Sequence, residues 1–172
     1  MERKNKFVRE TRSFKTARVF PSDVNNHNTL FGGKLMAYID DIASIAAAKF
    51  CRGSTVTAST DSVDFLHPIM PGDSVTLEAF VTWSGHSSME IFVKVIREHL
   101  TTGVKLIAAT AFLTFVAFDE QGQKMLVPLI VPETEEEIKL HQTAPQRAEQ
   151  RRVRREASRE LAAFLTTEYP WE

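Results

Sequence analysis

One short stretch of the chain holds the residues whose types and spacing suggest chemistry: Asn25, Gly32, Gly33 and Asp40. Two glycines at the start of a helix let a ligand approach backbone N–H groups that have no intrahelical partner, at the positive end of the helix dipole. A carboxylate two turns further along the same helix is placed to act as a base. Amide donors and a base in one segment indicate an enzyme that acts on a carbonyl group.

The spacing between the glycines and the aspartate limits how they can cooperate. Asp40 follows Gly33 by seven residues, which is roughly 10 Å along a helix. A reacting carbon must lie within about 3 to 3.5 Å of the attacking atom. One helix therefore cannot supply both groups to the same carbon, whereas two antiparallel helices related by a two-fold axis can. We predict a site that is shared between two subunits.

The helix that must position these groups is predicted over Phe31–Lys49. Its apolar residues recur at helical spacing and fall within about one quadrant of the helical wheel. Asp40 lies just outside this apolar stripe, so we expect it to be half-buried, while Asp41 falls on the far side with Lys34. Gly53 is expected to stop the helix. The stripe consists of Leu35, Ile39, Ile42, Ala43, Ala46 and Phe50.

The sequence predicts β-strands before and after this helix. The first strand precedes the helix and ends at Pro21, and the later ones are rich in β-branched residues or alternate between apolar and polar. The link around Gly85 is typical of a hairpin. One buried helix followed by four hairpin-linked strands predicts an α+β fold with an antiparallel sheet wrapped around the helix. The predicted strands are Ser13–Phe20, Thr55–Phe65, Ser74–Trp83, Met89–Glu98 and Val104–Phe118.

Composition narrows the class of protein. The chain has 172 residues, 43% hydrophobic and 25% charged, with a net charge of -1, which fits one soluble domain with an appendage and gives no overall attraction to nucleic acid or anionic membranes. No apolar run approaches the roughly 20 residues of a membrane-spanning helix. The charged start, residues 1–6, lacks the apolar segment of a secretory signal. We therefore expect a cytoplasmic protein.

The cysteine and the histidines offer little further chemistry. Cys51, the only cysteine, excludes an intramolecular disulfide. It is either a nucleophile or a buried thiol that packs as a small hydrophobic residue, and the lack of a Cys/His motif around it favours the thiol. The five histidines show no paired metal-ligand spacing, so we expect no metal site. Ser44, one turn after Asp40, either orients a water molecule or is an ordinary exposed helical serine.

A set of short segments appears in an order known from one family. The segments are Pro21-Ser22-Asp23-Val24-Asn25, Phe31-Gly32-Gly33, Leu35-Met36 followed by Asp40, Val56-Thr57-Ala58-Ser59, Asp64-Phe65, Gly85-His86-Ser87-Ser88-Met89-Glu90 and Val127-Pro128. With them the chain resembles the hotdog-fold acyl-CoA thioesterases of the long-chain acyl-CoA hydrolase type, over about residues 13–132. The glycine pair alone would be weak evidence, but the whole set in this order is specific.

This resemblance implies domain bounds and catalytic roles. It implies a hotdog thioesterase domain over 1–132 and a C-terminal helical, Arg-rich extension over 133–172. Asn25 and Asp40 would be the catalytic pair, with Asp40 acting either as general base on a water molecule or as the nucleophile. The amides of Gly32 and Gly33 would position the thioester, although two glycines can also serve only for tight packing.

The same resemblance implies the substrate and the assembly. The substrate would be a fatty acyl thioester of coenzyme A, with no metal and no cofactor other than the coenzyme A of the substrate itself. His86, Ser87 and Ser88 would contact coenzyme A, unless they form only a hairpin. The family builds dimers whose sheets join edge to edge, often as trimers of dimers, so we expect a homo-oligomer up to a hexamer. Asn28 departs from the small residue common among relatives.

Acidic residues and then arginines follow Pro132. Four glutamates crowd a first helical turn, where the dipole favours anions, and Pro145 is expected to interrupt the helix before a second one begins. The arginines of that second helix either meet coenzyme A phosphates or an acidic partner, or pair with the extension's own glutamates on a solvated face, which we favour. They are Arg147, Arg151, Arg152, Arg154, Arg155 and Arg159.

Other functions compete with acyl-CoA hydrolysis. A hotdog hydratase or dehydratase generally needs a histidine beside the acid, and Phe31–Phe50 contains none. A non-catalytic acyl-CoA-binding or sensing protein would share the fold, but the presence of both Asn25 and Asp40 favours retained chemistry. Nucleic-acid binding would rest on the arginines of the extension alone.

Overall fold

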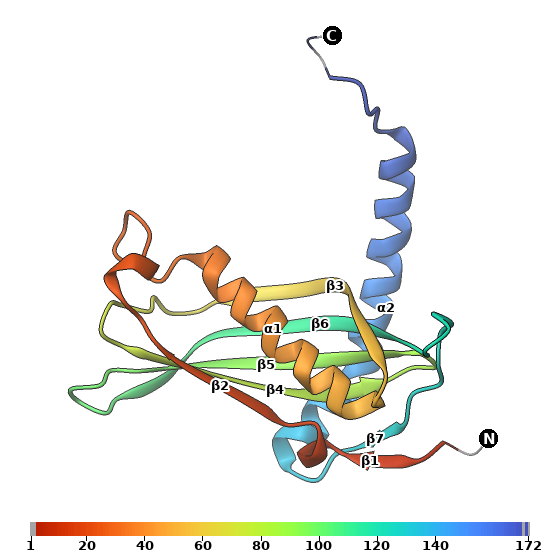
Figure 1. Cartoon of the computed structure of the whole chain (residues 1–172), viewed down its shortest axis with the longest axis horizontal. Helices are drawn as coiled ribbons and strands as arrows, with labels where there is room; N and C mark the ends of the chain where they lie inside the picture. Colours follow the sequence, from red (N-terminus) through yellow and green to blue (C-terminus); the bar gives the residue numbers. More distant parts are fainter. Residues whose placement is uncertain (1–2, 170, 172) are drawn as a thin grey trace.

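An antiparallel β-sheet wraps around one long helix in the computed structural model, which describes residues 3–169 and 171 (Figure 1). The main strands are β2 Ser13–Arg18, β3 Ser54–Phe65, β4 Ser74–Ser84, β5 Ser88–Glu98 and β6 Lys105–Phe118. They form a five-stranded sheet in the order β2-β4-β5-β6-β3, in which every neighbouring pair is antiparallel. This arrangement confirms the predicted α+β architecture. Met1 and Glu2 of the charged start lie outside the described residues.

The long helix α1, Gly32–Cys51, lies at the centre of the core. The six residues of the predicted apolar stripe are all buried, and they pack against the inward side chains that alternate along β4 and β5, such as Leu77 and Ile91. The helix ends at Cys51, and Arg52 rather than the predicted Gly53 makes the turn that stops it. Arg52 takes the left-handed conformation, with φ of 55°, and its N–H donates to the Ala48 carbonyl at 2.9 Å.

Short elements connect the two ends of the domain. Strand β1, Asn5–Phe7, pairs in parallel with β7, Leu129–Val131, and so joins the start of the chain to the segment after the sheet. Two 3-10 helices follow β1 and β2, η1 at Val8–Glu10 and η2 at Pro21–Asp23. β2 ends two residues before the predicted Phe20, and η2 then leads the chain towards α1.

One continuous helix, α2 at Glu135–Phe164, forms the C-terminal extension, so the predicted interruption at Pro145 is wrong. Proline removes one helical hydrogen bond, but His141 and Arg147 anchor the helix to the sheet on either side of it. Thr134 caps the start of α2 through a capping box. In Figure 1 the C-terminal end of α2 projects away from the sheet.

The extension follows β7 directly. β7 ends at Val131 and α2 begins at Glu135, and the division into domains at residue 132 stays a prediction. Within the described part of the chain, neither helix is long and apolar enough to cross a membrane.

Candidate active site

Asn25 lies in the loop between β2 and α1 and organises a turn around itself. Its side-chain oxygen accepts hydrogen bonds from the N–H groups of His27 at 2.9 Å and Thr29 at 3.3 Å. Its side-chain amide donates to the Thr29 hydroxyl at 3.0 Å. Asn28 has a left-handed φ of 59°, which asparagine tolerates better than most residues. These contacts fix the orientation of Asn25, and they explain why Asn28 suits its position.

Asp23 fastens the same loop to the start of α1. Its carboxylate pairs with Lys34 and accepts a hydrogen bond from the Phe20 N–H at 2.9 Å. Its carbonyl accepts one from the Phe31 N–H at 2.8 Å. The hydrogen bond from Lys34, together with that from Phe20, lowers the pKa of Asp23 below its usual value. The loop that holds Asn25 is therefore anchored by a carboxylate that is ionised at neutral pH.

The first amides of α1 are free in the single chain. The N–H groups of Lys34 and Leu35 both donate to the Phe31 carbonyl, at 3.0 and 3.1 Å, whereas those of Gly32 and Gly33 have no acceptor among the described residues. A Cβ at Gly33 would lie 2.5 Å from the Phe31 ring, so a side chain there would displace the ring. Free amides at a helix N-terminus suit an oxygen that carries negative charge.

A pocket of about 370 Å³ opens beside these amides. Asn25, Thr29 and Gly32 form its polar part, and Phe65 and Ile69 belong to its apolar part. Two of the predicted site residues, Asn25 and Gly32, thus line one cavity. Its mixture of donors and apolar wall fits a polar reacting group attached to a hydrocarbon chain.

Asp40 lies outside this pocket, on the side of α1 that faces β3. Its Oδ1 accepts a hydrogen bond from the Thr57 hydroxyl at 2.8 Å. The prediction that Asp40 is half-buried is wrong for the single chain, where its side chain is exposed. The reason is that β3 is an edge strand, so no further strand covers this side of α1. Asp41 is also exposed and pairs with Lys15 on β2, at the opposite edge of the sheet.

Thr57 is the site residue that sequence reasoning missed. In the sequence it is one of several threonines in a β-branched strand, and nothing marks it as a partner of Asp40. The topology brings Thr57 next to Asp40, because β3 runs back along α1 after the turn at Arg52 and Gly53. The one signal in the sequence was the segment Val56-Thr57-Ala58-Ser59, which belongs to the set that resembles the family but does not single out Thr57.

One chain does not bring all the predicted catalytic residues together. Asn25 and Gly32 share a pocket at the start of α1, while Asp40 lies two turns away beside β3. The free edge of β3 and the exposed part of α1 carry large apolar side chains that face solvent in the single chain. These are Phe31, Met36, Ile45, Val56 and Phe65.

The hairpin predicted to contact coenzyme A lies at the other end of β4. His86 is exposed, and its carbonyl accepts a hydrogen bond from the Val127 N–H at 3.0 Å. The Ser87 carbonyl accepts one from Ala117 at 2.8 Å. The pocket beside Asn25 lies near the start of β4, roughly 30 Å away along the strand. Within one chain, therefore, His86, Ser87 and Ser88 are not part of that pocket.

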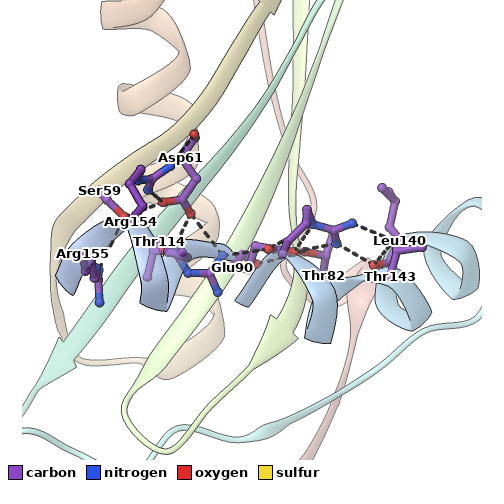
Figure 2. Close-up of polar contacts among 11 residues, drawn as sticks. Ser59, Asp61, Thr82, Glu90, Thr114, Leu140, Thr143, Arg154 and Arg155 are labelled. Atoms are coloured by element: carbon purple, nitrogen blue, oxygen red, sulfur yellow. Dashed lines mark hydrogen bonds and ion pairs between the residues drawn. The ribbon is translucent and has the colours of Figure 1, made fainter. Parts of the chain in front are cut away.

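Figure 2 shows how α2 contacts the outer face of the sheet. Charged side chains make most of the polar contacts drawn there. Glu90 on β5 is fully buried. Its carboxylate accepts hydrogen bonds from Arg147 at 2.8 Å, from Arg151 at 3.0 Å and from the Thr82 hydroxyl at 2.7 Å. The buried charge is thus compensated by two arginines that come from α2.

A second carboxylate, Asp61 on β3, receives the next arginines along α2. It pairs with Arg154, and it accepts from Arg151 at 3.2 Å and from the Thr114 hydroxyl at 2.6 Å. The prediction that the arginines pair with the glutamates of the extension is therefore wrong for most of this cluster. It holds for Arg152, which pairs with two glutamates of α2.

The remaining candidate groups have structural contacts. Cys51 is buried, and this burial raises the pKa of its thiol, which agrees with the packing interpretation. The Ser44 hydroxyl donates to the Asp41 carbonyl of the preceding turn at 2.7 Å. Among the described residues, no group of histidine, cysteine and carboxylate side chains is arranged to hold a metal ion.

Comparisons with known proteins agree on one family. The family described as Thioesterase superfamily matches residues 27–104, which include Gly32, Asp40 and Thr57. The chain is 64% identical to the uncharacterized acyl-CoA thioester hydrolase YkhA of Bacillus subtilis (strain 168) over 166 residues, which cover 96% of each protein.

Solved structures with the same fold include acyl-CoA hydrolases and acyl-CoA thioesterases. The acyl-CoA hydrolase from Staphylococcus aureus, in complex with butyryl coenzyme A, coenzyme A and coenzyme A disulfide, has a TM-score of 0.89 and 44% identity over 93% of this chain and 98% of that one. Other structures of that enzyme carry alanine in place of an aspartate, an asparagine or a threonine. An apo-hexameric acyl-CoA thioesterase has a TM-score of 0.85 and 45% identity, over 88% of this chain and 97% of that one.

Proposed function

Since the chain belongs to the Thioesterase superfamily, we propose that it hydrolyses fatty acyl-CoA to a free fatty acid and coenzyme A. The observation that carries this proposal is the pocket at the start of α1, where the unpaired Gly32 amide and the Asn25 side chain meet an apolar wall. The relatives with the same fold are named acyl-CoA hydrolases, and one of them binds butyryl coenzyme A.

The amides of Gly32 and Gly33 act on the thioester carbonyl. Attack on this carbonyl places negative charge on its oxygen, and a donor aimed at that oxygen typically lowers the barrier by roughly 3 kcal/mol. Both N–H groups are free and lie at the positive end of α1. Asn25, which is held by its own turn, orients the thioester in the same pocket.

Asp40 supplies the base or the nucleophile. As a base, it removes a proton from water while the water oxygen bonds to the carbonyl carbon, and the proton passes to the sulfur as the C–S bond breaks. As a nucleophile, its carboxylate oxygen bonds to the carbonyl carbon while the C–S bond breaks and coenzyme A leaves as a thiolate. Water then cleaves the mixed anhydride, which releases the fatty acid and restores Asp40, and a proton from that water passes to the thiolate. In both routes the Thr57 hydroxyl, 2.8 Å from Oδ1, holds the carboxylate in one orientation.

The complete site forms between two copies of the chain. Asp40 is roughly 10 Å along α1 from the Gly33 amide, too far for both to act on one carbon. The unpaired edge of β3 and the exposed apolar side chains of α1 provide a surface for a second copy. We propose a dimer that is joined through these edges and assembles further into a trimer of dimers, as a hexameric relative suggests. The cytoplasmic location and the absence of a cofactor stay predictions.

Release of free thiol from palmitoyl-CoA tests the proposed activity. We expect Asp40→Asn to lower kcat by about 100-fold to 10,000-fold, because a positioned base contributes that much. Asp41→Asn is the matched control, since among the described residues this neighbouring carboxylate pairs only with Lys15, and it should retain nearly full activity. A wild-type protein that binds palmitoyl-CoA without releasing thiol would instead be a non-catalytic acyl-CoA sensor.

A further inference from the structure

A second cavity lies on the outer side of the sheet, where the later part of α2 passes the hairpin between β4 and β5. Its volume is about 310 Å³. The side chains of Trp83 and Ser88 form the wall from the hairpin. The wall from α2 consists of four arginines together with Ala148 and one carboxylate, Glu156, so it carries a net positive charge. It is separate from the pocket that holds Asn25, which lies at the opposite end of β4.

Two of these four arginines already have carboxylate partners. Arg151 is bound to Asp61 and Glu90, at 3.2 and 3.0 Å. Arg152 is bound to Glu149 and Glu156, at 2.6 and 2.8 Å. These pairs hold the wall of the cavity in place and add little free positive charge.

The other two arginines lack such partners. Arg155 contacts only the Ser59 hydroxyl, at 3.5 Å, and Arg159 makes no ion pair within the described residues. They are one helical turn apart, so their guanidinium groups line the same cavity. Two unpaired guanidinium groups on one wall favour an anion, and the fork of N–H donors on each suits phosphate oxygens.

The hairpin wall adds an aromatic surface and a hydroxyl. The Trp83 ring lies across Gly85, where a Cβ would be 3.3 Å from the ring and 2.8 Å from the Ser88 hydroxyl. Glycine at this position therefore lets both side chains approach the backbone closely, and both line the cavity. Aromatic rings stack with nucleobases whatever the base. Together the two walls offer stacking for a base and charge-assisted donors for phosphate.

We propose that this arginine cavity binds a phosphorylated nucleoside, with Arg155 and Arg159 on the phosphates and Trp83 on the base. The inference rests on the proposed function in one respect. If the chain hydrolyses acyl-CoA, the phosphorylated nucleoside that enters the cavity is expected to be the nucleotide end of the substrate, which carries adenine and phosphates. A free nucleotide that binds independently of the thioester is the other source of the same chemistry.

Binding of adenosine 3',5'-bisphosphate and of ADP, measured by calorimetry on the full chain, tests the site directly. We expect Arg155→Gln combined with Arg159→Gln to weaken binding of the probes by at least about tenfold, because charge-assisted hydrogen bonds are lost. The matched control combines Lys124→Gln with Lys139→Gln, which removes the same charge from exposed lysines outside the cavity, and should leave binding unchanged. Equal affinity of the wild type and the arginine variant, or no binding of either probe, overturns the proposal.

Kinetics with two thioesters then separates the two sources. If the nucleotide end of the substrate occupies the cavity, the arginine variant shows a KM for acyl-CoA raised by about tenfold or more at nearly constant kcat. Its hydrolysis of an acyl N-acetylcysteamine thioester, which has no nucleotide, stays at the wild-type rate. Weakened probe binding with an unchanged KM assigns the cavity to a free nucleotide. A wild type that hydrolyses neither thioester contradicts the proposed function, while probe binding still decides the cavity.

Discussion

The two faces of the sheet are covered by helices that use opposite kinds of contact. α1 packs on one face through a stripe of apolar side chains, all buried. α2 docks on the other face through Glu90 and Asp61, which receive arginines from the helix (Figure 2). The apolar contact stabilises the fold by removing surface from water, whereas the charged contact stabilises it only while every partner is present.

This difference also separates the proposed roles of the two helices. The amides and the carboxylate of α1 can act on a thioester because its buried stripe leaves its first turn and one side free. α2 holds some arginines in ion pairs and leaves Arg155 and Arg159 to face a cavity. One helix thus presents reactive groups, and the other presents positive charge.

The largest expected effect on stability comes from the charged contact between α2 and the sheet. Glu90→Leu removes the fully buried carboxylate and leaves Arg147 and Arg151 without it, which should cost about 3 to 5 kcal/mol of the free energy of unfolding. Replacing Glu90, Arg147 and Arg151 together by leucine should recover much of this loss, because no charge is then stranded around position 90, and Asp61 keeps its pair with Arg154. Urea denaturation of both variants measures their free energies of unfolding. A triple variant less stable than Glu90→Leu would show that the stranded arginine charges are not the cause of the loss.

On the apolar face the response should be smaller. Ile42→Val removes one methylene group from a side chain that is 2% exposed, and we expect a loss of about 0.5 to 1.5 kcal/mol. No charge is involved, so the loss should be the same at low and high salt. A salt-dependent loss measured by denaturation would mean that the α1 face also depends on charges.

The anchor of the Asn25 loop should respond to pH. The pKa of Asp23 is lowered by Lys34 and by the Phe20 N–H, so its ionised form contributes stability that is present above the ordinary carboxyl pKa and lost as the pH falls through the lowered one. We expect Asp23→Asn to lower Tm at pH 7 and to have progressively less effect below about pH 4. A difference in Tm that stays constant down to pH 2 would argue against this anchor.

The smallest effect is expected where α2 is exposed. Within the described part of the chain, Glu149 pairs only with Arg152, and both side chains are 59% exposed, so the pair is well solvated. The hydrogen bond from Arg152 lowers the pKa of Glu149, yet Glu149→Gln should leave Tm unchanged within error. It is the control for Glu90→Leu, because each carboxylate pairs with an arginine of α2, Glu90 from the buried strand β5 and Glu149 from the exposed side of α2 itself. A drop in Tm of comparable size would remove the contrast between buried and exposed pairs.

The sequence predicts the contact between α1 and the sheet better than the contact between α2 and the sheet, and the reason is physical. The stripe from Leu35 to Phe50 follows from local periodicity, which a sequence displays directly. Glu90 alternates with Met89 and Ile91 and so appears to point into solvent. It is buried only because α2, some 50 residues later, returns to cover it.

In the candidate site, too, some features follow from local sequence and others depend on long-range packing. The Gly32 and Gly33 amides are predicted correctly as free, because helix ends leave such groups unpaired by rule. The exposure of Asp40 and its contact with Thr57 depend on which strand forms the edge of the sheet. That order is a long-range property, and a pattern of residue types does not encode it locally.

Mixing two inactive variants tests most directly whether the active site is shared. Chains with Asn25→Ala keep Asp40, and chains with Asp40→Ala keep Asn25, so a heterodimer contains one complete site if the two residues act across the two-fold axis. After exchange of subunits, confirmed by mass spectrometry, we predict that thiol release from palmitoyl-CoA returns to about half the wild-type rate per heterodimer. Proven exchange without any recovery of activity would contradict the shared site.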